Sequence, residues 1–127
     1  MKNLDHLLQL PNPWHGSALA EPVPGVATGF GELDELLPEQ GWAQSALTEL
    51  LVPREGIGAL QLLLPALARL SQQRRWIAWV APPYVPYAPA LRAAGVDLSR
   101  LLRIYPRSGA DGLGAVETCL RSGTCSA

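Results

Sequence analysis

The sequence predicts an α/β fold, in which helices cover a sheet of parallel strands. Short, almost wholly apolar runs alternate with longer runs whose apolar residues recur at helical spacing. Glycine or proline separates one run from the next. Three such alternations in succession are typical of a doubly wound, three-layer domain. With 127 residues, of which 48% are hydrophobic, the chain has room for one domain with a packed core.

The predicted elements follow one another in a regular order. Strands are expected over Ala46–Val52, Trp76–Ala81 and Leu101–Tyr105. The run from Trp76 is apolar on both faces, which indicates an interior strand of a parallel sheet. Helices are expected over Gly56–Gln73, Tyr87–Ala94 and Gly112–Arg121, and a glycine follows each of the last two closely. An earlier helical segment is expected over Thr28–Leu37, with Thr28 or Gly31 as its cap.

The chain divides into an arm and a domain. Residues 1–27 are expected to be an extended arm because they contain four prolines: Pro11, Pro13, Pro22 and Pro24. Trp14 in this arm could anchor a partner or pin the arm to its own domain. Residues 28–127 are expected to hold a partial α/β domain. We expect this domain to be cut short at its carboxyl end and only marginally stable, because a further strand should follow the last helix.

The stretch from Ala46 to Leu70 has the layout of a nucleotide-binding P-loop, with an apolar strand, a glycine-containing loop and an apolar helix. Such a loop needs a lysine that reaches the β- and γ-phosphates and a hydroxyl that binds Mg²⁺. Gly58 and Ala59 stand at these two places, and the chain's single lysine is Lys2. We therefore expect a protein that is not an enzyme and that has no cofactor and no metal site.

The degenerate loop consists of Pro53, Arg54, Glu55, Gly56, Ile57, Gly58 and Ala59. Its backbone amides and the start of the following helix could still bind an anion. The carboxylate of Glu55 argues against this, since it would repel phosphates. The simpler interpretation is a turn that only links the strand to the helix.

Tyr84 and Tyr87 are better candidates for contact with a partner. They follow the predicted strand over Trp76–Ala81, at the end where open α/β sheets bind ligands. Four prolines hold them rigid, so they would lose little entropy on binding: Pro82, Pro83, Pro86 and Pro89. A tight crossover from strand to helix explains the same residues equally well.

Composition argues against several other functions. The net charge of −1 gives no basic face for nucleic acid or membranes, and scattered arginines support DNA contact only weakly. The two histidines, His6 and His15, lie in the arm and form no catalytic arrangement with other side chains. Cys119 and Cys125 lack metal-site spacing and are expected to be reduced thiols. With no apolar run near ~20 residues, the protein is expected to be cytoplasmic.

Several of these segments together resemble a known superfamily. Thr28–Asp34, Gly41-Trp42 and Leu47–Leu51 resemble the segments that precede and form the P-loop strand of the recombinase A superfamily. The resemblance to the ImuA family is closer and extends over roughly Val23 to Cys125. Its most specific part is the proline- and tyrosine-rich run over Val80–Pro89, and further shared runs are Glu49–Leu51, Gly56–Gly58, Leu62–Leu70, Trp76–Ala78 and Ala94–Leu98.

The resemblance implies a recombinase A-like core that has lost ATP turnover. It also implies a role in SOS-induced translesion DNA synthesis, beside ImuB and an error-prone DNA polymerase. The related SulA-type cell division inhibitors suggest an alternative, in which the partner is the tubulin-like division protein FtsZ. The chain departs from the superfamily pattern at Gly58 and Ala59, and also at Val52, where the first loop glycine would stand.

Overall fold

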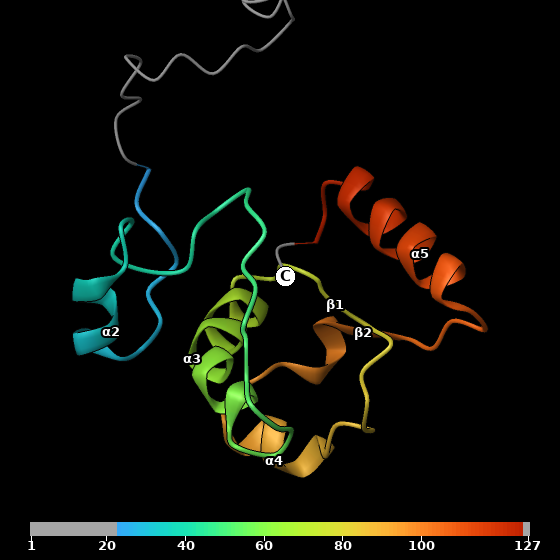
Figure 1. Cartoon of the computed structure of the whole chain (residues 1–127), viewed down its shortest axis with the longest axis horizontal. Coiled ribbons are helices and arrows are strands. Elements are labelled where there is room, and N and C mark those ends of the chain that lie inside the picture. Colours follow the sequence, from blue (N-terminus) through green and yellow to red (C-terminus); the bar gives the residue numbers. More distant parts are fainter. Residues whose placement is uncertain (1–22, 126–127) are drawn as a thin grey trace, which may run out of the picture.

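The computed structural model describes residues 23–125, so most of the predicted arm, including Trp14, lies outside the described residues (Figure 1). In chain order the elements are α2 (Gly31–Leu36), α3 (Ala59–Gln72), β1 (Ile77–Val80), α4 (Ala88–Ala93), the 3₁₀ helix η1 (Leu98–Arg100), β2 (Leu101–Ile104) and α5 (Gly109–Arg121). From α3 onward, helices and strands alternate as predicted, whereas no strand separates α2 from α3.

Among the residues that the structure describes, the sheet consists of the two parallel strands β1 and β2. Ile77 pairs with Leu101 at one end of the ladder, and Val80 pairs with Ile104 at the other. This confirms that two of the predicted strands are parallel neighbours. On the opposite edge of β1, Trp76 forms a single parallel bridge with Cys125. There the backbone N–H of Trp76 donates to the carbonyl oxygen of Thr124 at 3.3 Å.

The prediction of a strand over Ala46–Val52 is wrong. This segment has no regular structure, and Leu47 within it is 96% exposed. A strand needs a neighbour for its backbone hydrogen bonds. Among residues 23–125, the segment forms no ladder or bridge with either β1 or β2. Figure 1 shows the segment running past α3 without joining the sheet. The described residues thus form a mixed helix–strand fold around a two-stranded sheet, and the predicted three-layer core is not confirmed.

The hydrophobic core lies between α3, β1 and α4. Its buried side chains are Ala68, Ile77, Leu91 and Val96. Partly buried residues pack against them: Leu60, Leu64, Leu67, Trp79, Leu98 and Leu101. The residues from α3 recur three and four positions apart, so they share one face of that helix. In Figure 1, α3 and α4 lie on one side of the strands and α5 on the other.

Ser71 connects the end of α3 to the chain that follows α4. Its side chain is buried, and its hydroxyl donates to the carbonyl oxygen of Ala68 at 2.8 Å. The hydroxyl oxygen of Ser71 in turn accepts a hydrogen bond from the backbone N–H of Asp97 at 2.9 Å. Because the Ser71 hydroxyl that makes both bonds is buried, they fix the position of η1 relative to α3.

The segment before α3 is held by its own local contacts. Val26 and Trp42 form an antiparallel bridge, and the backbone N–H of the buried Thr28 donates to the carboxylate of Asp34 at 2.9 Å. The predicted caps for the helix were Thr28 or Gly31, whereas the observed N-cap is Phe30. Thr28 still supports this helix end, because its hydroxyl accepts from the N–H of Phe30 at 3.0 Å.

Candidate partner-binding surface

The degenerate loop joins an irregular segment to α3, with two glycines at its turn. Gly56 and Gly58 have positive φ angles of 80° and 94°, and Gly58 is the N-cap of α3. Such angles are easily adopted only by glycine, so they explain the glycines of this turn. Residues 53–57 are exposed, and Gly58 and Ala59 carry no charged or hydroxyl group.

Glu55 of this loop interacts with Tyr84 of the proline-rich loop. A hydrogen bond to Glu55, and secondly the negative charge of that carboxylate, raise the pKa of Tyr84 above its usual range. The phenol is therefore a donor to Glu55 at neutral pH. This contact brings the degenerate loop and the proline-rich loop, which lie about 30 positions apart in the sequence, to the same end of the sheet.

The proline-rich loop presents its aromatic side chains to solvent. It leaves β1 through Ala81, which has a positive φ of 49°, and it ends at Tyr87, the N-cap of α4. Tyr84 is 70% exposed and Tyr87 is 72% exposed. Both tyrosines therefore follow the carboxyl end of β1 and are exposed. Whether this surface binds a partner stays a prediction.

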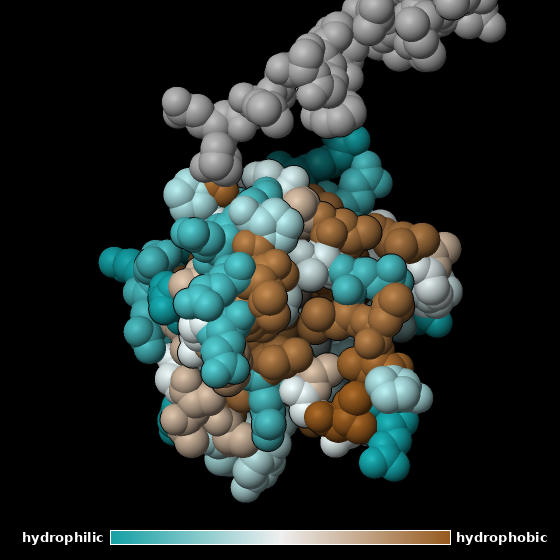
Figure 2. All heavy atoms as spheres, turned by 60° about the vertical axis from the view of Figure 1, so that its left-hand side comes forward, coloured by the Kyte–Doolittle hydropathy of each residue, from teal (hydrophilic) through white to brown (hydrophobic). Residues whose placement is uncertain are grey.

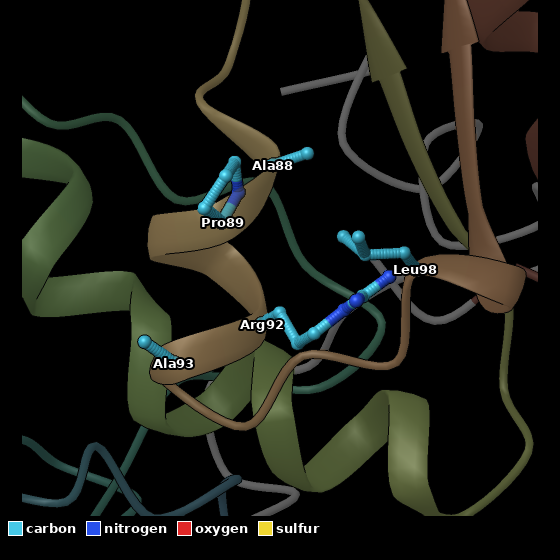
Figure 3. Close-up of a pocket in the computed structure, with 5 residues that line it drawn as sticks. All are labelled: Ala88, Pro89, Arg92, Ala93 and Leu98. Carbon is cyan, nitrogen blue, oxygen red and sulfur yellow. The ribbon is translucent and has the colours of Figure 1, made fainter.

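A hollow of about 370 Å³ lies directly beyond Tyr87. We call it the α4 pocket, and its lining residues are Ala88, Pro89, Arg92, Ala93 and Leu98. Figure 3 shows the side chain of Arg92 extending from α4 toward Leu98 of η1. The hollow forms because three of its α4 residues have small side chains, while Leu91 of the same helix points into the core.

The position of Leu98 is fixed by the residues on either side of it. The carboxylate of Asp97 accepts from the backbone N–H of Ser99 at 2.9 Å and from its hydroxyl at 2.7 Å. These hydrogen bonds lower the pKa of Asp97, so the carboxylate is ionised and already engaged. The resulting turn holds Leu98 at the wall of the α4 pocket.

Sequence reasoning missed the α4 pocket. Two signals could have indicated it. Arg92 is the one long polar side chain in a run of small residues over Ala88–Ala94. Asp97 followed two positions later by Ser99 is typical of a turn closed by a side chain. Neither signal shows that Leu98 and α4 meet, because that contact depends on the packing of Leu91 and Val96 in the core.

Other sites have little support in the described part of the chain. Within residues 23–125, no group of three or more His, Cys, Asp or Glu residues is placed to hold a metal ion. Cys119 and Cys125 carry free thiols, and burial together with the nearby Cys125 raises the pKa of Cys119. No helix between residues 23 and 125 is long and apolar enough to cross a membrane. Figure 2 shows apolar side chains gathered on one face of the molecule.

Comparison with known proteins identifies two groups of relatives. A family model described as cell division inhibitor SulA matches residues 46–127. The chain is 35% identical over 68 residues to the cell division inhibitor SulA of Edwardsiella piscicida, covering 53% of this chain and 40% of the relative. It is 27% identical over 86 residues to SulA of Serratia marcescens, covering 68% of this chain and 51% of the relative.

The second group consists of recombinases. The chain is 34% identical over 101 residues to RecA of Chlorobaculum parvum, covering 80% of this chain but 29% of that protein. The chain thus spans less than a third of this RecA and between 40% and 51% of the SulA relatives. The likeness to RecA agrees with the predicted recombinase-like origin, and it is partial.

Proposed function

The chain belongs to the SulA family of cell division inhibitors, and from this premise we propose that it inhibits division in the SOS response by binding a protein partner. The family match across residues 46–127 is the observation that carries the proposal. This match includes the degenerate loop, the proline-rich loop and the α4 pocket. The proposed partner is FtsZ, the tubulin-like division protein.

The proposed contact is made by the exposed tyrosines. Tyr84 and Tyr87 combine large contact area with few rotatable bonds, which is why tyrosine is frequent among residues that dominate binding energy. The prolines on either side of these tyrosines restrict the backbone of the loop before binding. Preorganisation of this kind lowers the entropy lost on association.

Expression in bacterial cells tests this function. The chain should make cells filament, and the purified protein should reduce FtsZ polymerisation measured by sedimentation. Tyr87→Ala should weaken binding about tenfold, as expected for an exposed aromatic at the centre of an interface. Phe30→Ala is the matched control, because Phe30 is an exposed aromatic outside the family match. Equal loss in both variants, or no filamentation by the wild type, would count against the proposal.

We further propose that the protein does not hydrolyse ATP. Gly58 and Ala59 offer neither the cation that holds the phosphates nor the hydroxyl that binds Mg²⁺. Phosphate release during titration with ATP and Mg²⁺ should equal that of a blank without protein. Turnover that disappears in Arg54→Ala would show that an arginine has taken the role of the lysine, and would overturn this proposal.

The likeness to RecA supports a second candidate function. It extends over 101 residues of the chain, more than the 68 and 86 residues shared with the two SulA proteins. The candidate is an ImuA-like accessory role in translesion DNA synthesis, in which the partners are ImuB and an error-prone DNA polymerase. Capture of purified ImuB by the chain, with a change in damage-induced mutation frequency and no filamentation, would favour this function over division inhibition.

A further inference from the structure

The α4 pocket combines an apolar hollow with one cation that is not neutralised. Within residues 23–125, the guanidinium of Arg92 has neither an ion pair nor a side-chain hydrogen bond. The nearest acidic residue in the sequence, Asp97, is engaged by Ser99 and faces the charge of Arg100. Arg92 is therefore available to a carboxylate brought by a ligand.

The rest of the pocket suits an apolar side chain. Ala88, Pro89, Ala93 and Leu98 offer only carbon atoms beyond the backbone, and Figure 3 shows Leu98 and the Arg92 side chain reaching toward each other. A volume of about 370 Å³ is more than twice the roughly 150 Å³ of engineered cavities that bind benzene. One leucine or phenylalanine side chain and a neighbouring carboxylate can enter together.

We propose that the α4 pocket binds a protein segment in which a large apolar residue is followed by an acidic residue. The apolar side chain enters the hollow between α4 and η1, and the carboxylate pairs with the guanidinium of Arg92. The pocket begins one residue after Tyr87, so a segment bound there would also pass the exposed tyrosines. The inference rests on the proposed function in assigning this segment to the protein partner.

Three short peptides test the pocket directly, without any assumption about the partner. They are acetyl-Gly-Leu-Asp-Gly-amide and two variants, in which Asn replaces Asp or Ala replaces Leu. Binding to the ¹⁵N-labelled full chain is followed by NMR shifts of the α4 and η1 amides. The Leu-Asp peptide should bind with a dissociation constant of about millimolar order. The Leu-Asn peptide should bind about two- to fivefold more weakly, as for one solvent-exposed ion pair.

Two substitutions separate the contributions of charge and shape. Arg92→Gln should abolish the difference between the Leu-Asp and Leu-Asn peptides while weak binding of both persists. Ala88→Phe should fill the exposed mouth of the pocket and reduce binding of both leucine peptides at least fivefold. Arg103→Gln is the matched control, because Arg103 is an exposed arginine on β2, and it should leave all three affinities unchanged. Thermal melts establish that each variant is folded.

The outcomes distinguish the pocket from the proposed function. Two results would overturn the proposal for the α4 pocket even if FtsZ is inhibited. One is equal binding of all three peptides, and the other is that Arg103→Gln loses the preference for the Leu-Asp peptide as Arg92→Gln does. Selective binding of the Leu-Asp peptide that depends on Arg92 supports the pocket even if FtsZ is unaffected, and that pair of results would reject the division role alone.

Discussion

The two sides of the sheet differ sharply in how their helices are packed. On the side of α3 and α4, Leu91 is only 3% exposed, whereas on α5 the chemically identical Leu120 is 73% exposed. The only buried residue of α5 is Gly112, while α3 has Ala66, Ala68 and Ser71 buried. Both helices nevertheless carry apolar residues at amphipathic spacing, and both contact β1.

This difference shows that an amphipathic pattern predicts a helix but not its burial. The core side is well packed for two reasons. Ser71 of α3 is hydrogen-bonded to Asp97 before η1, and the buried cluster around Ile77 joins α3 to α4. The α5 side has no such third element among residues 23–125. The proposed binding surface lies near the well-packed side, which supplies a rigid base for the proline-rich loop and the α4 pocket.

The largest expected effect comes from truncating the same residue type on the two sides. Leu91→Ala should lower the free energy of unfolding by about 2–5 kcal/mol, because it leaves a cavity among Ala68, Ile77 and Val96. Leu120→Ala, its counterpart on α5, should change it by less than about 0.5 kcal/mol. Urea unfolding followed by circular dichroism measures both. Similar losses in the two variants would mean that the α5 side is as well packed as the α3 side.

A smaller effect is expected from removing one hydroxyl on each side. Ser71→Ala should cost about 1–3 kcal/mol, because it removes a buried hydroxyl and leaves the part-buried backbone N–H of Asp97 without its acceptor. Ser122→Ala removes an equally direct bond, from its hydroxyl to the carbonyl oxygen of Cys119 at 2.6 Å, but water can replace it at this exposed site. Its effect should stay within about 0.5 kcal/mol. A larger loss from Ser122→Ala would contradict the comparison.

Local sequence patterns predicted most helices and strands on both sides of the sheet. Long-range packing determines which apolar runs pair as strands and which elements contact one another. Apolar runs predicted β1 and β2 because each has a neighbour to pair with. The run over Ala46–Val52 is not a strand, since it pairs with neither β1 nor β2 among residues 23–125. The missing lysine at Gly58 and the exposed tyrosines could be read from the sequence. The contact of Glu55 with Tyr84 and the α4 pocket could not, because each joins residues from separate elements.

The stability of the core side should also depend on pH through Asp97. Hydrogen bonds from Ser99 place the pKa of this carboxyl below its usual value of 3.8 in the folded protein. The ionised carboxylate of Asp97 therefore adds to the free energy of unfolding above pH about 4. This stabilisation is lost as the pH falls through the lowered pKa of the folded state. Asp97→Asn should unfold at lower urea concentration than the wild type at pH 6. The difference between the two urea midpoints should become smaller toward pH 2.5.

A matched acid on the other side sharpens this test. Glu117 on α5 is exposed and pairs with Arg121 at 2.9 Å, one helical turn away. Pairs of this kind contribute little in solution. Glu117→Gln should therefore unfold at nearly the wild-type urea concentration at every pH between 2.5 and 6. If the gap between wild type and Asp97→Asn were as wide at pH 2.5 as at pH 6, the lowered pKa of Asp97 would not be its cause.

The smallest expected effect on stability concerns the apolar stripe of α5. Leu113, Val116 and Leu120 recur three and four positions apart, so they share one helix face, and all three are exposed. Replacing Leu113 and Leu120 by Gln keeps helix propensity nearly constant, because the two residue types are close on that scale. The unfolding midpoint should hardly move, while the concentration at which the protein begins to scatter light should rise as the exposed apolar area falls.

A decrease of more than about 1 kcal/mol in the free energy of unfolding of this double variant would show that the stripe is packed against the rest of the chain. The two sides of the sheet would then be alike, and the poor packing of α5 would not explain why one leucine tolerates truncation and the other does not.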